Sequence, residues 1–157
     1  YVLADKICQA LGMESSQIGL NVAADAEYTS TFDDTANMSA YFSDWDHSYH
    51  ITTVAGGEKK ESIQAFVSGI DIKKGGKYRL SFKIETSDGA EIPFVIRSKS
   101  TGEIIFEDTF TGTGTKSPYE KEFESPITAA DAELVFSLGG TNNLRMSLYE
   151  VKAVKFE

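Results

Sequence analysis

Short stretches in which apolar and polar residues alternate recur along this 157-residue chain and limit the folds open to it. The clearest is residues 77–85, with the sequence KYRLSFKIE, in which four apolar side chains alternate with polar ones. Because successive side chains of a β-strand point to opposite faces, this pattern predicts a strand with one buried face and one solvated face. Strands of this kind are typical of antiparallel sheets that pack one face on a core.

Further stretches show comparable patterns, and clusters of glycine, aspartate and asparagine separate them. They are residues 49–54, 62–68, 92–98, 103–110, 119–124, 133–138 and 145–156. The last is long enough for two strands and changes its alternation near Glu150, which predicts a bulge or a bend. Since no helical stretches alternate with the strands, the sequence predicts an all-β domain, a two-sheet antiparallel β-sandwich of the jelly-roll type.

The first residues of the chain differ in character from the rest. Leu3, Ile7 and Leu11 are spaced four apart and Gly12 follows them, which predicts a short N-terminal helix that ends at the glycine. Cys8 lies beside that apolar stripe, so we interpret it as a small buried side chain rather than a nucleophile.

We divide the chain into an N-terminal helix and connector, residues 1–20, and a β-sandwich, residues 21–157. A length of 157 residues favours one domain with its own core rather than two. The chain begins with tyrosine and shows no basic segment followed by an apolar one. We therefore interpret it as a piece of a longer protein.

Charge and cysteine content exclude several classes of partner and site. The chain has 15 Lys and Arg residues against 24 Asp and Glu residues, a net charge of −9. Such an acidic protein lacks the basic footprint of a nucleic-acid or anionic-membrane binder, and no stretch approaches the roughly 20 apolar residues of a membrane-spanning helix. A single cysteine excludes an internal disulfide and a multi-cysteine metal site. We expect a monomer with no nucleic-acid or membrane partner.

Familiar catalytic motifs do not occur in the sequence. It contains no nucleophile elbow, phosphate-binding loop, HExxH zinc motif or dinucleotide fingerprint. A glycosidase needs two carboxylates at a defined separation, and no feature distinguishes two of the 24 acidic residues. We therefore predict that the domain is not an enzyme, with a jelly-roll lyase or hydrolase as an alternative.

Residues 44–50, DWDHSYH, concentrate functional side chains: two carboxylates, two imidazoles, a tyrosine and the only tryptophan. Histidine and aspartate are metal ligands, but two histidines three residues apart suit a helix better than a strand. The same rings, with their polar neighbours, suit a platform for sugars. A third interpretation is a polar loop whose Trp45 folds onto the core.

From about residue 32, the order of features resembles that of carbohydrate-binding modules of families 4, 9 and 22. The features are FDD at 32–34, SIQAFVSGIDI at 62–72, KGGKYRLSFK at 74–83, AELVFSLGG at 132–140 and LYEV at 148–151. The third contains the Gly-x-x-Tyr-x-Leu-Ser-Phe strand of these families. The resemblance spans residues 32–154 and depends on the order and spacing of these features together.

The resemblance implies a jelly-roll module that binds a single polysaccharide chain in a cleft on its concave sheet and catalyses nothing. Modules of this kind belong to extracellular proteins, secreted or held at the cell surface. The resemblance therefore implies β-glucan or xylan of plant cell walls as the ligand, and a covalently linked glycoside hydrolase as the partner that the module targets.

Predicted ligand contacts lie on the strands and in the 44–50 segment. Gln64 matches a sheet-borne glutamine of these families, and Phe66 shares its face because strands have a period of two. Arg97 offers a rigid fork of donors. The residues predicted for the rim of the cleft are Trp45, Tyr49 and His47.

No cofactor is required by this interpretation, but the resemblance makes structural calcium possible. Asp33, Asp34 and Glu150 offer the hard oxygen ligands that calcium prefers, although an aspartate found near the last strand of many members is replaced at Tyr149 or Glu150. Glu61 occupies the place of a frequent aromatic three residues before the glutamine, and one tryptophan stands where most members have several. These departures predict weak binding or an unusual ligand.

The alternative function is a structural or protein-interaction domain of a multidomain extracellular protein, without sugar binding. In that case the predicted N-terminal helix would dock on a neighbouring domain. The fold alone does not separate the two functions, because β-sandwiches host many of them.

Overall fold

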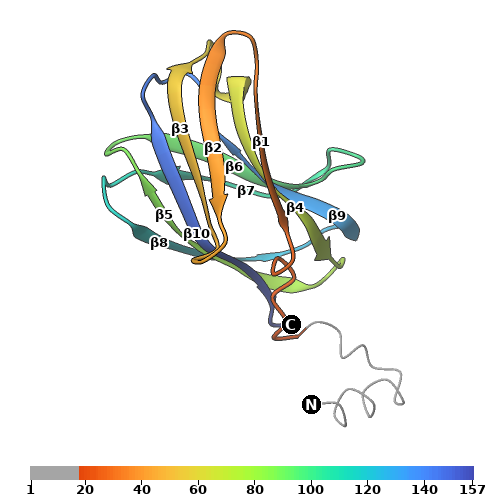
Figure 1. Cartoon of the computed structure of the whole chain (residues 1–157). Coiled ribbons are helices and arrows are strands. Elements are labelled where there is room, and N and C mark those ends of the chain that lie inside the picture. The colour runs from red at the N-terminus through yellow and green to blue at the C-terminus, as the bar shows by residue number, and fades with distance from the viewer. Residues whose placement is uncertain (1–17) are drawn as a thin grey trace, which may run out of the picture.

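The computed structural model describes residues 18–157, which form a sandwich of two five-stranded antiparallel sheets (Figure 1). The first sheet has the strand order β1-β4-β9-β6-β7, and the second has the order β2-β3-β10-β5-β8. The elements are β1 (Glu27–Phe32), β2 (Ala36–Ser43), β3 (Ser48–Gly56), η1 (Lys60–Ser62), β4 (Ile63–Ile72), β5 (Lys77–Thr86), β6 (Glu91–Ser98), β7 (Ile104–Thr111), β8 (Ser117–Glu124), β9 (Ala129–Ser137) and β10 (Arg145–Lys155). The predicted all-β sandwich is confirmed.

Each stretch predicted as a strand coincides with one of β3 to β10. The pairing of β10 with β5 shifts between Tyr149 and Lys152, and Glu150 has a φ of 52°, so the predicted irregularity is a bulge within one long strand. The sequence did not predict β1 and β2. The predicted N-terminal helix and Cys8 lie outside the described residues.

Alternating burial in the strands builds the core between the sheets. In β5, Tyr78, Leu80, Phe82 and Ile84 are at most 2% exposed, as their alternation predicts. The first sheet contributes its own inward side chains, among them Ile63, Phe94, Ile96, Leu134 and Phe136. Removal of these side chains from water is the main force that holds the sheets together.

None of the helical turns in residues 18–157 is long and apolar enough to cross a membrane.

The outward residues of the first sheet are set in rows by the strand register. Gln64 of β4 lies opposite Ser137 of β9, while Phe66 lies opposite Val135, which in turn lies opposite Val95 of β6. Gly139, just after β9, holds its backbone against the carbonyl oxygen of Lys59, and any Cβ at this position would collide with it. The close approach fixes η1 beside the end of β9 and so positions one end of the sheet face.

Both ends of the described chain lie at one end of the sandwich (Figure 1). Ile18 forms a parallel bridge with Lys155, and Asn21 forms an antiparallel bridge with Val154. The Asn21 side chain also accepts a hydrogen bond from the Ala153 backbone at 2.9 Å. These contacts attach the entering segment to the last strand.

Candidate functional site

A groove of about 360 Å³ lies on the outer face of the first sheet. It crosses β4, β9 and β6 and reaches the first residue of β7. The residues that line it are Lys60, Glu61, Gln64, Pro93, Phe94, Val95, Arg97, Gly102, Ile104, Val135 and Ser137. These positions are far apart in the sequence and are brought together only by the pairing of the strands.

The floor of the groove is apolar. Val135 is only 2% exposed although it points outward, because Phe66 and Val95 flank it in register. Pro93, two residues before Val95, continues the apolar surface on the same face, and Ile104, half of its surface exposed, forms the far wall. Aliphatic side chains of this kind contact apolar C–H surfaces without directional demands.

Polar groups stand at the sides of this floor. Gln64 is half-buried and carries both a donor and an acceptor in one rigid amide, and Ser137 opposite it adds a hydroxyl. Sugar hydroxyl groups also donate and accept, so an amide and a hydroxyl can satisfy them in pairs. A few polar groups beside an apolar floor are typical of small-molecule sites.

Arg97 closes one end of the groove and is held by an ion pair. Its Nε lies 3.0 Å from Oε1 of Glu133, whose side chain is 6% exposed, whereas that of Arg97 is 33% exposed. The pair joins β6 to β9 across the register of these two residues. Part of the guanidinium fork is therefore committed to Glu133, and the rest reaches the groove.

At the other end, η1 borders the groove. The Lys60 ammonium donates to the carbonyl oxygen of Glu91 at 2.8 Å, and so ties η1 to the first residue of β6. Glu61 stands next to it and is exposed, so a carboxylate lies at this end of the groove.

The structure brings together some of the predicted contact residues. Gln64 and Arg97 line the groove, and Phe66 adjoins its floor without lining it. Tyr49 does not belong to the rim, because its side chain points inward from β3, is 6% exposed and donates its hydroxyl to Ser30 at 2.7 Å. Alternation in β3 explains this position, since Ile51 on the same face is also buried.

The β2–β3 turn carries Trp45 and His47, and neither lines the groove. Trp45 is 89% exposed, so the interpretation that it folds onto the core is wrong. His47, at a φ of 53°, meets the rings of Tyr28 and Phe42 edge-on at 5.7 and 5.0 Å. The turn therefore displays a free indole beside a small ring cluster.

The predicted calcium ligands do not converge. Asp33 lies in the β1–β2 turn, where a hydrogen bond from the Thr35 hydroxyl at 2.6 Å lowers the pKa of its carboxyl. Glu150 lies in the bulge of β10, and the hydrogen bond that it accepts from the Lys83 ammonium, 3.0 Å away, lowers the pKa of its carboxyl. Opposite ends of β3 adjoin these two places, so roughly 26 Å separates them. Within residues 18–157, no three metal-ligating side chains are grouped.

Sequence reasoning missed most residues of the groove, among them Lys60, Pro93, Phe94, Gly102, Ile104, Val135 and Ser137. Val135 belongs to a continuous run of apolar residues, LVF, because both faces of β9 are buried there. A run without alternation does not indicate which of its side chains points outward. The signal that could have found it is the pairing of β9 with β4, because Gln64 and Ser137 share a row.

No protein-family model and no curated protein matches the sequence. Solved structures with the same fold include a family 4 carbohydrate-binding module (TM-score 0.71, 18% identity, 87% of this chain and 93% of that one). Another is the apo form of the CBM1 module of BiXyn10A (TM-score 0.66, 14% identity, 85% and 94%). A third is the N-terminal cellulose-binding domain of Cellulomonas fimi β-1,4-glucanase C (TM-score 0.61, 17% identity, 80% and 93%). This chain has the jelly-roll fold of carbohydrate-binding modules.

Proposed function

We propose that this chain is a non-catalytic carbohydrate-binding module that binds one polysaccharide chain in the groove of the first sheet. The observation that carries the proposal is the apolar floor of Val135 and Val95, with the Gln64 amide and the Ser137 hydroxyl beside it. Sugar rings have apolar C–H faces and polar hydroxyl edges, and the groove offers a surface for each.

The ligand we propose is neutral, a β-glucan or xylan of plant cell walls. Each cation of the groove already has a partner, since Lys60 donates to a backbone carbonyl and Arg97 pairs with Glu133. A net charge of −9 disfavours an anionic polysaccharide further. Among proteins with this fold, one is described as a cellulose-binding domain, and another was solved in complex with β-1,4-galactotriose (TM-score 0.52, 13% identity).

The role we propose is to keep an attached glycoside hydrolase close to an extracellular substrate. A tethered binding module raises the effective concentration of the enzyme at the polysaccharide, without a new catalytic contact. The absence of tyrosine and tryptophan from the residues that line the groove predicts weak binding to each site. Repeated sites along a polymer compensate for weak binding to any one of them.

Affinity gel electrophoresis with soluble β-glucans, xylan, galactan, mannan and pectin tests the proposal. We expect retardation by a neutral glycan, and about a tenfold loss of affinity in Gln64→Ala, which is a loss of about 1.4 kcal/mol. Val95→Glu places a charge on the floor and should abolish retardation. Ser68→Ala is the matched control, because Ser68 shares the strand and face of Gln64 but does not line the groove.

Retardation that Gln64→Ala and Val95→Glu leave unchanged would overturn the proposed site. No retardation by any of these glycans would favour the protein-interaction alternative. Release of reducing sugar, or a rise in ultraviolet absorbance as from a lyase, would contradict the non-catalytic role.

A further inference from the structure

The outer face of the second sheet carries a row of rings that is separate from the groove. Tyr41 of β2 is 64% exposed, and its ring stacks on the imidazole of His50 with 4.7 Å between centroids and 19° between planes. His50 in turn meets the ring of Tyr149 edge-on at 5.7 Å. Lys116 places its Nζ 3.8 Å above the ring of Tyr149. A large part of the Tyr41 ring remains in contact with solvent.

Hydrogen bonds hold the central ring of this row in place. The hydroxyl of Ser48, which is fully buried, donates to Oδ1 of Asp46 at 2.6 Å, so its oxygen is left to accept Nε2–H of His50 at 2.7 Å. Nδ1 of His50 is then the acceptor for the hydroxyl of Ser147 at 2.8 Å. The imidazole is fixed through both nitrogens, which preorganises the ring stacked upon it.

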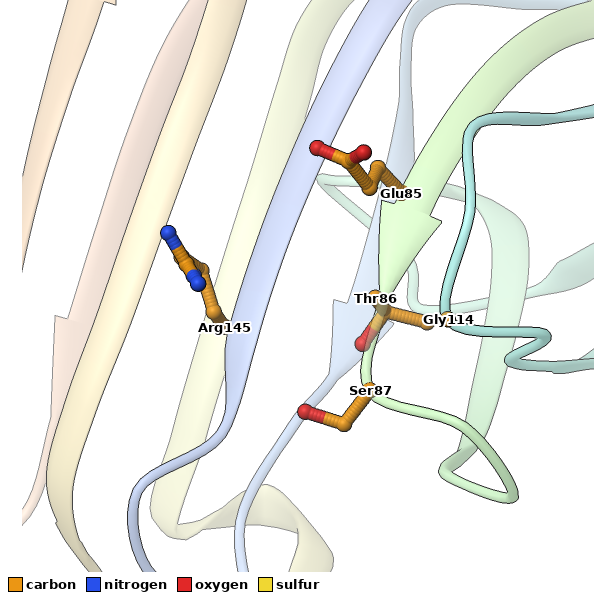
Figure 2. Close-up of a pocket in the computed structure, with 5 residues that line it drawn as sticks. All are labelled: Glu85, Thr86, Ser87, Gly114 and Arg145. Atoms are coloured by element: carbon orange, nitrogen blue, oxygen red, sulfur yellow. The ribbon is translucent and has the colours of Figure 1, made fainter.

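A cavity of about 360 Å³ lies on the same sheet face. It is lined by Glu85, Thr86, Ser87, Gly114 and Arg145, and the charged side chains of Glu85 and Arg145 extend from the neighbouring strands β5 and β10 (Figure 2). Both charged side chains are exposed, and neither forms an ion pair or a hydrogen bond with another residue of the described chain. The cavity therefore offers a free acceptor and a free donor group.

The rings and the cavity form one continuous surface. The strand register places Tyr41, His50, Ser147 and Glu85 side by side across four adjacent strands. At about 4.8 Å between strands, this row spans about 14 Å. Arg145 lies two residues from Ser147 and points to the same side. The surface is long enough to hold several groups of one extended ligand.

We propose that this surface is a second saccharide-binding site, with Tyr41 as the stacking ring and Glu85 and Arg145 as the hydroxyl-binding pair. The ligand is a neutral saccharide, because hydroxyl groups satisfy a carboxylate and a guanidinium together, whereas an anionic sugar would meet the charge of Glu85. A C–H face of the sugar packs on the exposed ring of Tyr41. The inference shares the ligand chemistry of the proposed function but none of its residues.

NMR titration of the whole chain tests the inference, with shifts of assigned backbone amides as the readout. The probes are soluble oligosaccharides of β-glucan, xylan, galactan and mannan. We expect one of them to shift amides of β2, β3 and β10, and Tyr41→Ala, Glu85→Gln and Arg145→Gln each to weaken that response at least tenfold. Val54→Ala is the control, since Val54 is exposed on β3 and lies outside the ring row and the cavity.

The outcomes for the two sites are separate. Shifts on the second sheet that persist in Gln64→Ala support the second site, even where the groove does not respond. Shifts confined to β4, β6 and β9 overturn the second site and leave the groove intact. Equal responses of Tyr41→Ala and the native protein also overturn it, as does the absence of shifts on β2, β3 and β10 with every probe.

Discussion

The ion pair between Arg97 and Glu133 should respond unequally to loss of its two members. Glu133 has a 6% exposed side chain, so Arg97→Met leaves a buried carboxylate without its cation. Loss of one partner of a buried pair costs about 3 kcal/mol of the free energy of unfolding. Arg97 is 33% exposed and can be hydrated, and Glu133→Gln keeps an oxygen that accepts from it. We expect that substitution to cost about 1 kcal/mol.

Urea unfolding and thermal melts of the two variants, both followed by circular dichroism, measure the difference. For a domain of this size, each kcal/mol lost from the free energy of unfolding lowers Tm by about 2–4 °C. We therefore expect Tm to fall by about 6–12 °C in Arg97→Met and by about 2–4 °C in Glu133→Gln. Sugar affinity should fall more in Arg97→Met than in Glu133→Gln, because Arg97→Met removes the guanidinium donors at the groove. Arg79→Met is a matched control, because the Arg79 ion pairs with Glu120 and Glu122 are largely exposed and should contribute little.

Equal destabilisation by Arg97→Met and Glu133→Gln would refute this reasoning, since it depends on the difference in burial. A loss below about 1 kcal/mol in Arg97→Met would refute it as well, because an unpaired buried carboxylate costs more than that. The double variant Arg97→Met/Glu133→Leu removes both charges and should recover most of the stability that Arg97→Met loses.

Tyr49→Phe removes the hydrogen bond to Ser30 and should lower the free energy of unfolding by about 1 kcal/mol in urea titrations, without loss of sugar affinity. Tyr28→Phe should leave stability unchanged or raise it, because the Tyr28 hydroxyl is buried without a hydrogen-bond partner among the described residues and burial raises its pKa to about 12. The hydrogen bond from Tyr119 lowers the pKa of Asp108. The stability that this bond contributes is therefore present above about pH 4 and is lost as the pH falls through the lower pKa of the folded state. In acid unfolding, Asp108→Asn should lose less of its free energy of unfolding between these pH values than the native protein does. Treatment with EDTA should leave Tm unchanged in calorimetry, because no three ligating side chains are grouped in residues 18–157.

Period-two alternation was sufficient to predict the strands whose inward faces are continuously apolar. In β5 each second residue is buried, and the same rule correctly places Gln64 outward between buried Ile63 and Ala65. In the edge strands β1 and β2, serine, threonine and alanine interrupt the alternation of large apolar and polar side chains, so the sequence pattern did not reveal them.

Contacts between distant strands account for what the sequence did not reveal about the site. The partner of Arg97 depends on the pairing of β6 with β9, which no local pattern specifies. Sequence proximity suggested one rim made of the 44–50 segment. The turn instead sends Trp45 to solvent, Tyr49 into the core and His50 to the outer face of the second sheet, because the strand that begins at Ser48 alternates its side chains.

The bridges of Ile18 and Asn21 with the end of β10 make the domain suitable for circular permutation. Because these segments already lie side by side, a short flexible linker can join residue 157 to residue 18 without crossing either sheet. New ends can then be opened at the exposed turn of Asp44 and Trp45, between β2 and β3, which lines neither the groove nor the cavity. Surface turns of this kind tolerate such circular permutation, and a permuted chain would present the same two sheet faces from a different point of attachment.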